Sequence, residues 1–123
     1  MRRLVFIIFA LAGCDARPPV EAAAGAATRA APTFKASCST PKLSVCSEYT
    51  DAAFALGEEV LKIGCTQSHG AWSPARCPSA KRLGSCTLTG THRLYYPGGE
   101  HEFSGATAAK DCTELYQGSW AAN

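Results

Sequence analysis

The stretch Leu83-Gly-Ser-Cys-Thr-Leu-Thr-Gly-Thr-His-Arg-Leu-Tyr-Tyr96 has the pattern of two β-strands joined by a tight turn. This pattern is the strongest indication of the fold. The expected strands are residues 83–89 and 92–96. Gly90-Thr91 between them suits a two-residue hairpin turn with glycine first. Pro97-Gly98-Gly99 follows and should end the second strand, because proline and paired glycines favour turns. The stretch therefore predicts an antiparallel β-hairpin.

Two helices are expected on either side of this hairpin. Residues 48–63 carry apolar side chains at steps of four, three, four and three, which gives one stripe along a helix. Ser47 is a candidate N-cap, and Gly64 suits the C-terminal stop. The second, shorter helix is expected over residues 105–115, with Ser104 as its cap. The stripe of the first helix consists of Tyr49, Ala53, Leu56, Val60 and Ile63.

Both helices end in a similar run of residues. The first run is Cys65-Thr-Gln-Ser-His-Gly-Ala-Trp72, and the second is Cys112-Thr-Glu-Leu-Tyr-Gln-Gly-Ser-Trp120. Residues 118–120 suit a short strand. We expect two helix-then-strand units side by side, with each tryptophan filling the gap beneath its cysteine. The predicted fold is a small, disulfide-rich α+β domain in which two helices pack on a short antiparallel sheet.

The cysteines indicate an exported, disulfide-stabilised domain. One of the seven, Cys14, belongs to an N-terminal motif described below, and an even six remain. Their spacings contain no Cys-x-x-Cys pair, which disfavours zinc binding and redox chemistry, so we expect no metal and no cofactor. The six expected disulfide cysteines are Cys38, Cys46, Cys65, Cys77, Cys86 and Cys112.

Six cysteines allow fifteen pairings, and the sequence does not select one. As a working hypothesis, each helix-end cysteine, Cys65 and Cys112, bonds to Cys77 or Cys86. That arrangement would leave Cys38 near Cys46.

The first fourteen residues have the organisation of an export signal. Arg2 and Arg3 form a positive start, residues 4–12 are apolar, and Leu11-Ala-Gly-Cys14 follows. The apolar run is far shorter than the roughly 20 residues of a membrane-spanning helix. Leu-Ala-Gly-Cys resembles the lipobox of bacterial lipoproteins. The resemblance implies a signal peptide over residues 1–13 and a diacylglycerol on Cys14, with a further acyl chain such as palmitate usual on its new amino group.

The alternative is an ordinary secretory signal that is cut after Ala10-Leu11-Ala12 and leaves Cys14 as a spare thiol. Under the lipoprotein interpretation the domain is anchored in the bacterial cell envelope, on the periplasmic side of the inner membrane or in the outer membrane. Asp15 resembles an inner-membrane retention signal of enteric bacteria, but the rule depends on lineage, so both membranes stay open.

The mature chain divides into a tether and a domain. Residues 14–37 are rich in alanine and proline without periodic large apolar residues, so we expect a flexible arm with a reach of roughly 25 to 30 Å. Residues 38–123 form the six-cysteine domain, with structure starting near Phe34. Once Arg2 and Arg3 are removed, ten basic residues balance ten acidic ones. This balance disfavours nucleic acid as a partner.

The order of cysteines and Gly-x-Trp pairs resembles that of small cysteine-rich lipoproteins of proteobacteria with no assigned function. The resemblance covers about residues 38–120 and includes Cys46-Ser-Glu-Tyr-Thr50, Gly70-x-Trp72, Cys77-Pro78 and Gly118-x-Trp120. It implies an exported disulfide domain and transfers no activity or site residue.

No residues with a catalytic spacing stand out, so we expect no catalytic residues and no enzyme activity. The serines lack Gly-x-Ser-x-Gly or Ser-x-x-Lys contexts. His101 with Glu100, Glu102 and His69 could in principle bind a metal, but a polar surface loop is the interpretation that we adopt. A basic, aromatic face near the hairpin is a possible binding site for an anionic glycan or an envelope protein. Its members would be Trp72, Arg76, Lys81, Arg82, Arg93 and Tyr95.

These observations favour a lipid-anchored, non-catalytic module with a binding or structural role in the envelope. The alternative is an envelope-anchored inhibitor that offers a stapled loop, residues 76–82, to a hydrolase, because pre-organisation lowers the entropy cost of binding. A rigid, protruding loop would favour the inhibitor, and a loop packed on the domain would favour the other hypothesis.

Overall fold

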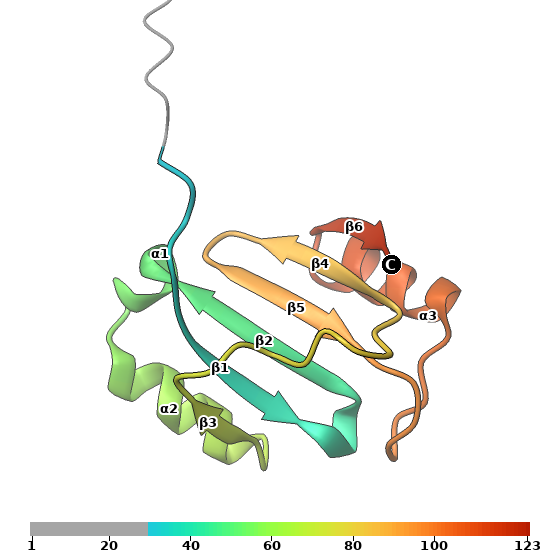
Figure 1. The fold of residues 1–123 in the computed structure, drawn as a ribbon, viewed down its shortest axis with the longest axis horizontal. Coiled ribbons are helices and arrows are strands. Elements are labelled where there is room, and N and C mark those ends of the chain that lie inside the picture. The colour runs from blue at the N-terminus through green and yellow to red at the C-terminus, as the bar shows by residue number, and fades with distance from the viewer. Residues whose placement is uncertain (1–29) are drawn as a thin grey trace, which may run out of the picture.

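A six-stranded antiparallel sheet, in the order β3-β1-β2-β5-β4-β6, forms the centre of the protein (Figure 1). The computed structural model describes residues 30–123. The expected signal peptide, Cys14 and the tether up to residue 29 lie outside the described residues. The strands are β1 Phe34–Thr40, β2 Val45–Thr50, β3 Ala71–Ser73, β4 Gly84–Leu88, β5 Thr91–Tyr95 and β6 Ser119–Ala122.

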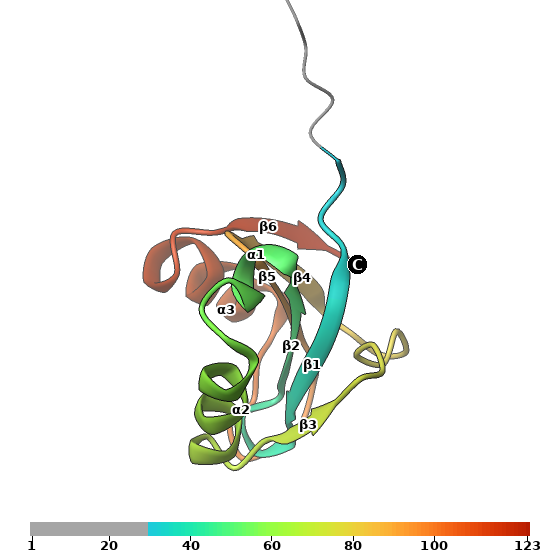
Figure 2. The ribbon, with the colours of Figure 1, turned by 90° about the vertical axis from the view of Figure 1, so that its left-hand side faces the viewer.

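The helices lie on one face of the sheet, and a long loop crosses the other face (Figure 2). They are α1 Asp51–Phe54, α2 Glu58–Gln67 and α3 Gly105–Lys110, which continues into a π-helical turn, Asp111–Leu115. A 3-10 turn, Pro41–Leu43, joins β1 to β2. Over residues 30–123, no helix is long and apolar enough to cross a bilayer. The small, disulfide-rich α+β fold with an antiparallel sheet is therefore confirmed.

The hairpin of β4 and β5 is confirmed, with one change at its turn. Leu88 pairs with Thr91, so the two loop residues are Thr89 and Gly90, and glycine is second instead of first. Gly90 has a φ of +76°, a left-handed conformation that glycine adopts without steric cost. At the other end of the domain, β1 begins at Phe34, so residues 34–37 belong to the sheet and not to the tether.

The prediction of a single helix over residues 48–63 was wrong. Strand β2 continues to Thr50, because it pairs with both β1 and β5 and this pairing outweighs the helical periodicity. Ser47 is therefore a strand residue and not an N-cap. Gly57, with a φ of +98°, separates α1 from α2, and α2 runs through Gly64 to Gln67. Within α2, Glu58 and Lys62 form an ion pair at 3.0 Å.

The second predicted helix is confirmed together with its cap. The Ser104 side chain accepts a hydrogen bond from the Thr107 backbone N–H, and the Thr107 hydroxyl accepts one from the Ser104 N–H, so the two residues form a capping box. Phe103, just before the cap, and Ala108 are buried in one cluster with Tyr95. This cluster is the larger of the two parts of the core.

All six expected cysteines form disulfides, although the pairing differs from the hypothesis. Cys86 bonds to Cys112 as one expected option, but Cys65 bonds to Cys38. Cys46 bonds to Cys77. The register explains why Cys38 and Cys46 stay apart. Cys38 lies opposite Ser47, the neighbour of Cys46, so the two cysteines point to opposite faces of the sheet.

The two similar sequence runs belong to a structural repeat of the form strand-strand-helix-strand. In the first repeat Cys38 pairs with Trp72 across β1 and β3, and in the second Cys86 pairs with Trp120 across β4 and β6. Tyr49 and Tyr95 lie beside these tryptophans, each with 5.5 Å between ring centroids. Each repeat therefore brings a disulfide, a tyrosine and a tryptophan together, with the two rings stacked in the first repeat and edge-to-face in the second.

A pseudo-twofold axis relates the repeats and passes through the paired residues Ser47 and Arg93 of β2 and β5. The repeats consequently join through these central strands, and β3 and β6 form the two outer edges of the sheet. The expected side-by-side helix-then-strand units were therefore wrong. In each repeat a glycine, Gly70 or Gly118, lies directly against the helix-to-strand disulfide.

We predict that the two repeat glycines cannot accept a methyl group. A Cβ on Gly70 would lie 2.5 Å from Cys38 Sγ and 2.9 Å from Cys65 Sγ, and one on Gly118 would overlap Cys86 Sγ. Gly70→Ala and Gly118→Ala should each lower the free energy of unfolding by about 1–3 kcal/mol. Gly64→Ala is the control, because a Cβ there meets nothing within 4 Å, and it should stabilise α2 by up to about 1 kcal/mol. Guanidinium denaturation measures all three, and equal effects at Gly64 and Gly118 would contradict the packing.

Candidate functional site

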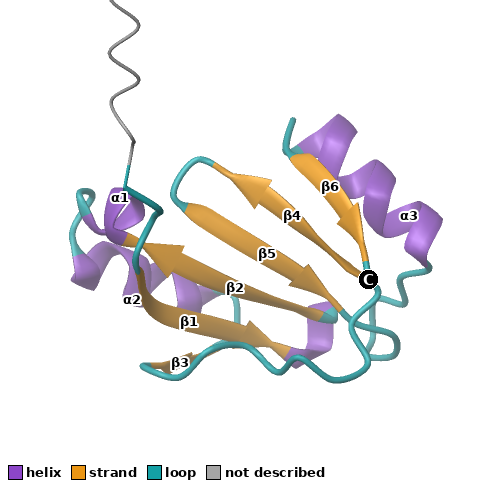
Figure 3. Ribbon diagram, turned by 45° about the horizontal axis from the view of Figure 1, so that its top comes forward, coloured by secondary structure: helices purple, strands orange, loops and turns teal. Residues whose placement is uncertain are grey.

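The helix-free face of the sheet carries the candidate site, because the loop between the repeats crosses it there (Figure 3). We call this loop, residues 74–83, the strap. Its centre is fixed by the Cys46–Cys77 disulfide. Ser37 Oγ donates to the Ala75 carbonyl at 2.7 Å, and Tyr96 OH donates to the Pro78 carbonyl at 2.6 Å. These bonds hold the first half of the strap against the sheet.

Glu48 is the polar anchor beneath the strap. Its side chain is 9% exposed, and its two oxygens accept from different donors. Oε1 accepts from the Cys77 backbone N–H at 3.0 Å, and Oε2 accepts from Arg76 Nη1 at 2.8 Å. The Arg76 guanidinium also lies 4.5 Å from the centroid of the Phe34 ring. A carboxylate buried in this way is tolerated because each of its oxygens has a donor.

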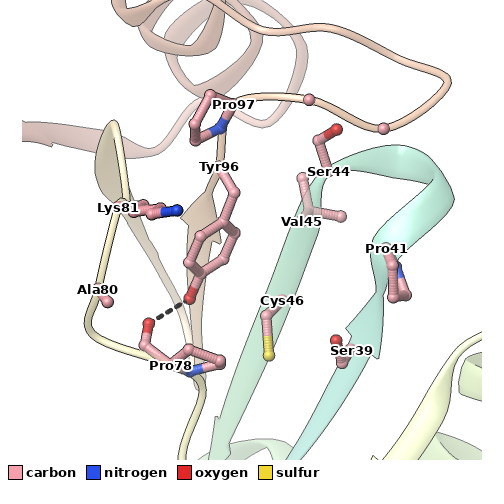
Figure 4. A pocket seen from close by; sticks show the side chains of 12 residues that line it. Ser39, Pro41, Ser44, Val45, Cys46, Pro78, Ala80, Lys81, Tyr96 and Pro97 are labelled. Atoms are coloured by element: carbon pink, nitrogen blue, oxygen red, sulfur yellow. Dashed lines mark hydrogen bonds between the residues drawn. The ribbon is translucent and has the colours of Figure 1, made fainter.

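A mostly apolar pocket of about 460 Å³ opens between the strap and two turns at the same end of the sheet (Figure 4). One wall is the turn that joins β1 to β2, the second is the strap, and the third is the turn after β5. The residues that line it are Ser39, Pro41, Ser44, Val45, Cys46, Pro78, Ala80, Lys81, Tyr96, Pro97, Gly98 and Gly99.

Backbone hydrogen bonds lock two of these walls together. Tyr96 N–H donates to the Ser44 carbonyl at 2.9 Å, and the amides of Glu100 and His101 both donate to the Lys42 carbonyl. Gly99 packs so closely that a Cβ there would lie 2.6 Å from the Pro41 carbonyl oxygen. Together with the disulfide-bonded strap, these contacts give the pocket fixed walls before any ligand arrives.

One cationic group distinguishes the pocket from a plain apolar hollow, and a second polar group, the Ser44 hydroxyl, is buried against Gly99 within its wall. Ser44 is 4% exposed, has a φ of +56°, and its hydroxyl has no hydrogen-bond partner among the described residues. Lys81 is exposed and also has a positive φ, of 59°. Its ammonium is placed at the strap side of the pocket, next to the Tyr96 ring (Figure 4). The combination suits a small apolar group with an anionic substituent.

Burial raises the pKa of the Tyr96 hydroxyl above its ordinary value, and the nearby positive charge of Arg82 opposes that rise. The hydroxyl is therefore protonated at neutral pH and can donate to the Pro78 carbonyl. Burial also raises the pKa of Tyr95 strongly, with a further rise from its hydrogen bond to Asp111 at 2.7 Å. Both hydroxyls act as structural donors.

The histidines lie on different parts of the fold. His69 follows the C-cap of α2, His92 lies in β5, and His101 packs against the Phe103 ring at 4.5 Å between centroids. In the described part of the chain, no group of three or more histidine, cysteine, aspartate or glutamate side chains has the geometry to hold a metal ion.

The six residues of the expected basic, aromatic face lie on both sides of the sheet. Trp72 and Arg93 are on the helix side, and Arg93 lies over the rings of Tyr95 and Tyr116. Tyr95 is fully buried. On the opposite side, Arg76 pairs with Glu48 and Lys81 lines the pocket, while Arg82 Nε donates to the Asn123 side chain. The structure thus brings Lys81, but not the whole set, to the candidate site.

Most of the residues that line the pocket were not predicted from the sequence. Ser44 and Gly99 are distant in the chain and meet only through the pairing of β2 with β5. The available signal was the alternation in the second hairpin strand, which puts Leu94 and Tyr96 on one face, followed by a proline-glycine turn. Comparisons with protein-family models, with curated proteins and with solved structures find no match to this chain.

We predict that Glu48 stabilises the strap chiefly through the Cys77 amide. Glu48→Ala leaves that buried N–H without its acceptor and should lower the free energy of unfolding by about 1–3 kcal/mol. Glu48→Gln keeps an oxygen for the amide and loses only the charge pair with Arg76, whose side chain is 65% exposed, so its cost should be smaller. Chemical denaturation of both variants checks this, and an equal cost for the two would contradict it.

The raised pKa of Tyr95 predicts a loss of stability at alkaline pH. In the unfolded chain a tyrosine ionises near pH 10, whereas burial holds the proton on Tyr95 in the folded chain to a higher pH. The stabilisation is therefore complete below about pH 10 and declines as the pH rises through the folded pKa. Urea denaturation between pH 9 and about pH 11 should show this decline, and Tyr95→Phe should reduce its slope. An unchanged slope in the variant would refute the assignment.

Proposed function

We propose that this chain is a lipid-anchored cell-envelope protein whose domain is a non-catalytic, disulfide-stabilised binding module. The lipobox resemblance at Leu11-Ala-Gly-Cys14 supports the anchor. The pairing of all six remaining cysteines supports an oxidising compartment outside the cytoplasm. A binding role fits a rigid domain at the end of an arm that lets it approach partners near the membrane.

The observation that carries the binding role is the strap pocket. Its walls are held by a disulfide and by backbone hydrogen bonds, so binding need not order them. Its volume of about 460 Å³ falls within the range of small-molecule sites. Proline, valine, tyrosine and disulfide surfaces would contact an apolar group. The Lys81 ammonium would select an acidic substituent, from a small molecule, a glycan derivative or a peptide end.

The inhibitor of a hydrolase is the second candidate, and one observation favours it. The strap from Pro78 to Lys81 is exposed, while its flanks are fixed by Cys77 on one side and by β4 on the other. A short exposed segment between two fixed ends is the arrangement of a pre-organised inhibitory loop. The first half of the strap is exposed as well, but Ser37 and Glu48 tie it to the sheet by hydrogen bonds, which favours the pocket as the principal site.

Intact mass spectrometry of the protein from its native membrane tests the anchor. The expected mass lacks residues 1–13, includes a diacylglycerol and is lower by the six hydrogens lost in three disulfides. A mass without lipid, or free thiols among the six cysteines, would contradict the proposal.

The pocket is tested on the same protein with anilinonaphthalene sulfonate, an apolar probe with one anionic group. Amide chemical shifts should move around the strap pocket in NMR spectra, and Ala80→Trp should abolish these shifts by filling it. Ala75→Trp is the matched control, because Ala75 is on the same strap but does not line the pocket. Shifts that persist in Ala80→Trp would place the probe elsewhere and remove the support for a ligand site.

A further inference from the structure

The repeat gives each position of α2 an internal counterpart in α3. Gly57 and Ser104 are the N-caps of the two helices, and Cys65 and Cys112 bond them to the sheet at equivalent points. Counting from these positions, Val60 corresponds to Thr107 and Ile63 corresponds to Lys110. At these two helix positions the second repeat therefore has polar residues where the first has large apolar ones. By the same count Leu56 corresponds to Phe103, which is buried in the core.

Two apolar residues of α2 and one residue just before it are exposed to water. Val60 and Ile63, three residues apart on one face of α2, are 59% and 54% exposed, and Leu56, in the linker before the Gly57 N-cap, is 71% exposed. We call them the α2 stripe. Cys65 on the opposite side of the helix is 1% exposed and makes the bond to β1. Since Thr107 and Lys110 serve at the equivalent positions, the fold itself does not require apolar residues at Val60 and Ile63.

The described chain begins beside α1, and α2 runs away from this point toward Cys38 of β1, to which its Cys65 is bonded (Figure 2). The Asp51 N–H at the start of α1 donates to the Thr33 carbonyl at 3.0 Å, which holds the segment before β1 next to α1. Leu56 follows α1 by two residues. The sixteen steps from Cys14 to Ala30 span at most about 55 Å when extended. A lipid on Cys14 would thus keep a bilayer surface within reach of the stripe at all times.

We propose that the α2 stripe docks the domain on the lipid bilayer to which Cys14 anchors it, an inference that rests on the proposed lipid anchor. Leu56, Val60 and Ile63 insert at the level of the headgroups and the first methylenes. Docking in this geometry turns the helix layer toward the membrane. The strap pocket, on the opposite face of the sheet, then faces the aqueous side and is open to ligands.

The charges on α2 predict which lipids it binds. Its one basic residue, Lys62, lies 3.0 Å from Glu58 and 3.3 Å from Glu59, so the helix has no free cation for anionic headgroups. Docking should therefore be apolar, should occur on neutral phosphatidylcholine, and should be insensitive to salt. A basic amphipathic helix would require anionic lipid and would lose binding as the salt concentration rises.

Tryptophan quenching by brominated lipid tests the proposal with a matched pair of variants. Ile63→Trp puts a reporter in the stripe, and Lys110→Trp puts it at the equivalent position of the second repeat, where the side chain is 71% exposed. The full-length lipidated proteins are reconstituted in vesicles of phosphatidylcholine brominated near the headgroup. The emission added by Ile63→Trp should fall about twofold or more, and that of Lys110→Trp should change little.

The same vesicles separate the possible failures. Flotation shows whether the wild-type chain is anchored at all; a chain that does not float refutes both the proposed anchor and this docking. Chains that float while both reporters are unquenched refute the docking alone, as does equal quenching of the two. Loss of quenching in high salt, or a need for anionic lipid, would overturn the apolar mechanism. Dimers in sedimentation experiments that protect residue 63 would identify a second copy as the occupant of the stripe.

Discussion

The rest of the structure depends on the pairing of β2 with β5. This pair joins the two repeats, and its register places Ser47 opposite Arg93 on the pseudo-twofold axis. A shift by one residue would turn every side chain of one repeat to the other face of the sheet. Tyr95 would leave the core and Tyr96 would leave the pocket. The pocket depends on the same register, because Ser44 lies just before β2 and Tyr96 just after β5, and the two meet through the Tyr96 N–H.

The three disulfides play two different roles on this framework. Cys38–Cys65 and Cys86–Cys112 are equivalent in the repeats, and each ties a helix to a strand next to the sheet edge. Cys46–Cys77 has no counterpart and fixes the strap that connects the repeats. In a domain of this size the hydrophobic core contributes little net stability, so the cross-links supply much of it. The third bond also builds the candidate site, because it closes one wall of the pocket.

The features that the two repeats share are sufficient to form the fold. The differences between the repeats therefore point to function. The first repeat has the α2 stripe, with apolar side chains in water, whereas the second buries Phe103 and Ala108 in a complete core. The second also has one more residue between its helix cysteine and the glycine on the disulfide, which the π-helical turn accommodates. The lipid-facing and ligand-facing surfaces proposed above lie on opposite sides of the sheet, so both can be occupied at once.

The local features of this protein could be predicted from its sequence alone. The β4–β5 hairpin, the capped second helix with Phe103 before it, and the assignment of six cysteines to disulfides all depend on neighbours within a few residues. Tertiary structure decided what depends on partners far along the chain. Residues 48–50 have a helical pattern, yet they form a strand because β1 and β5 both offer hydrogen bonds there. Cys38 bonds to Cys65 because the sheet orients its side chain toward α2. The pocket likewise exists only where Ser44, the strap and Gly99 converge, and no local pattern encodes a contact between residues so widely separated.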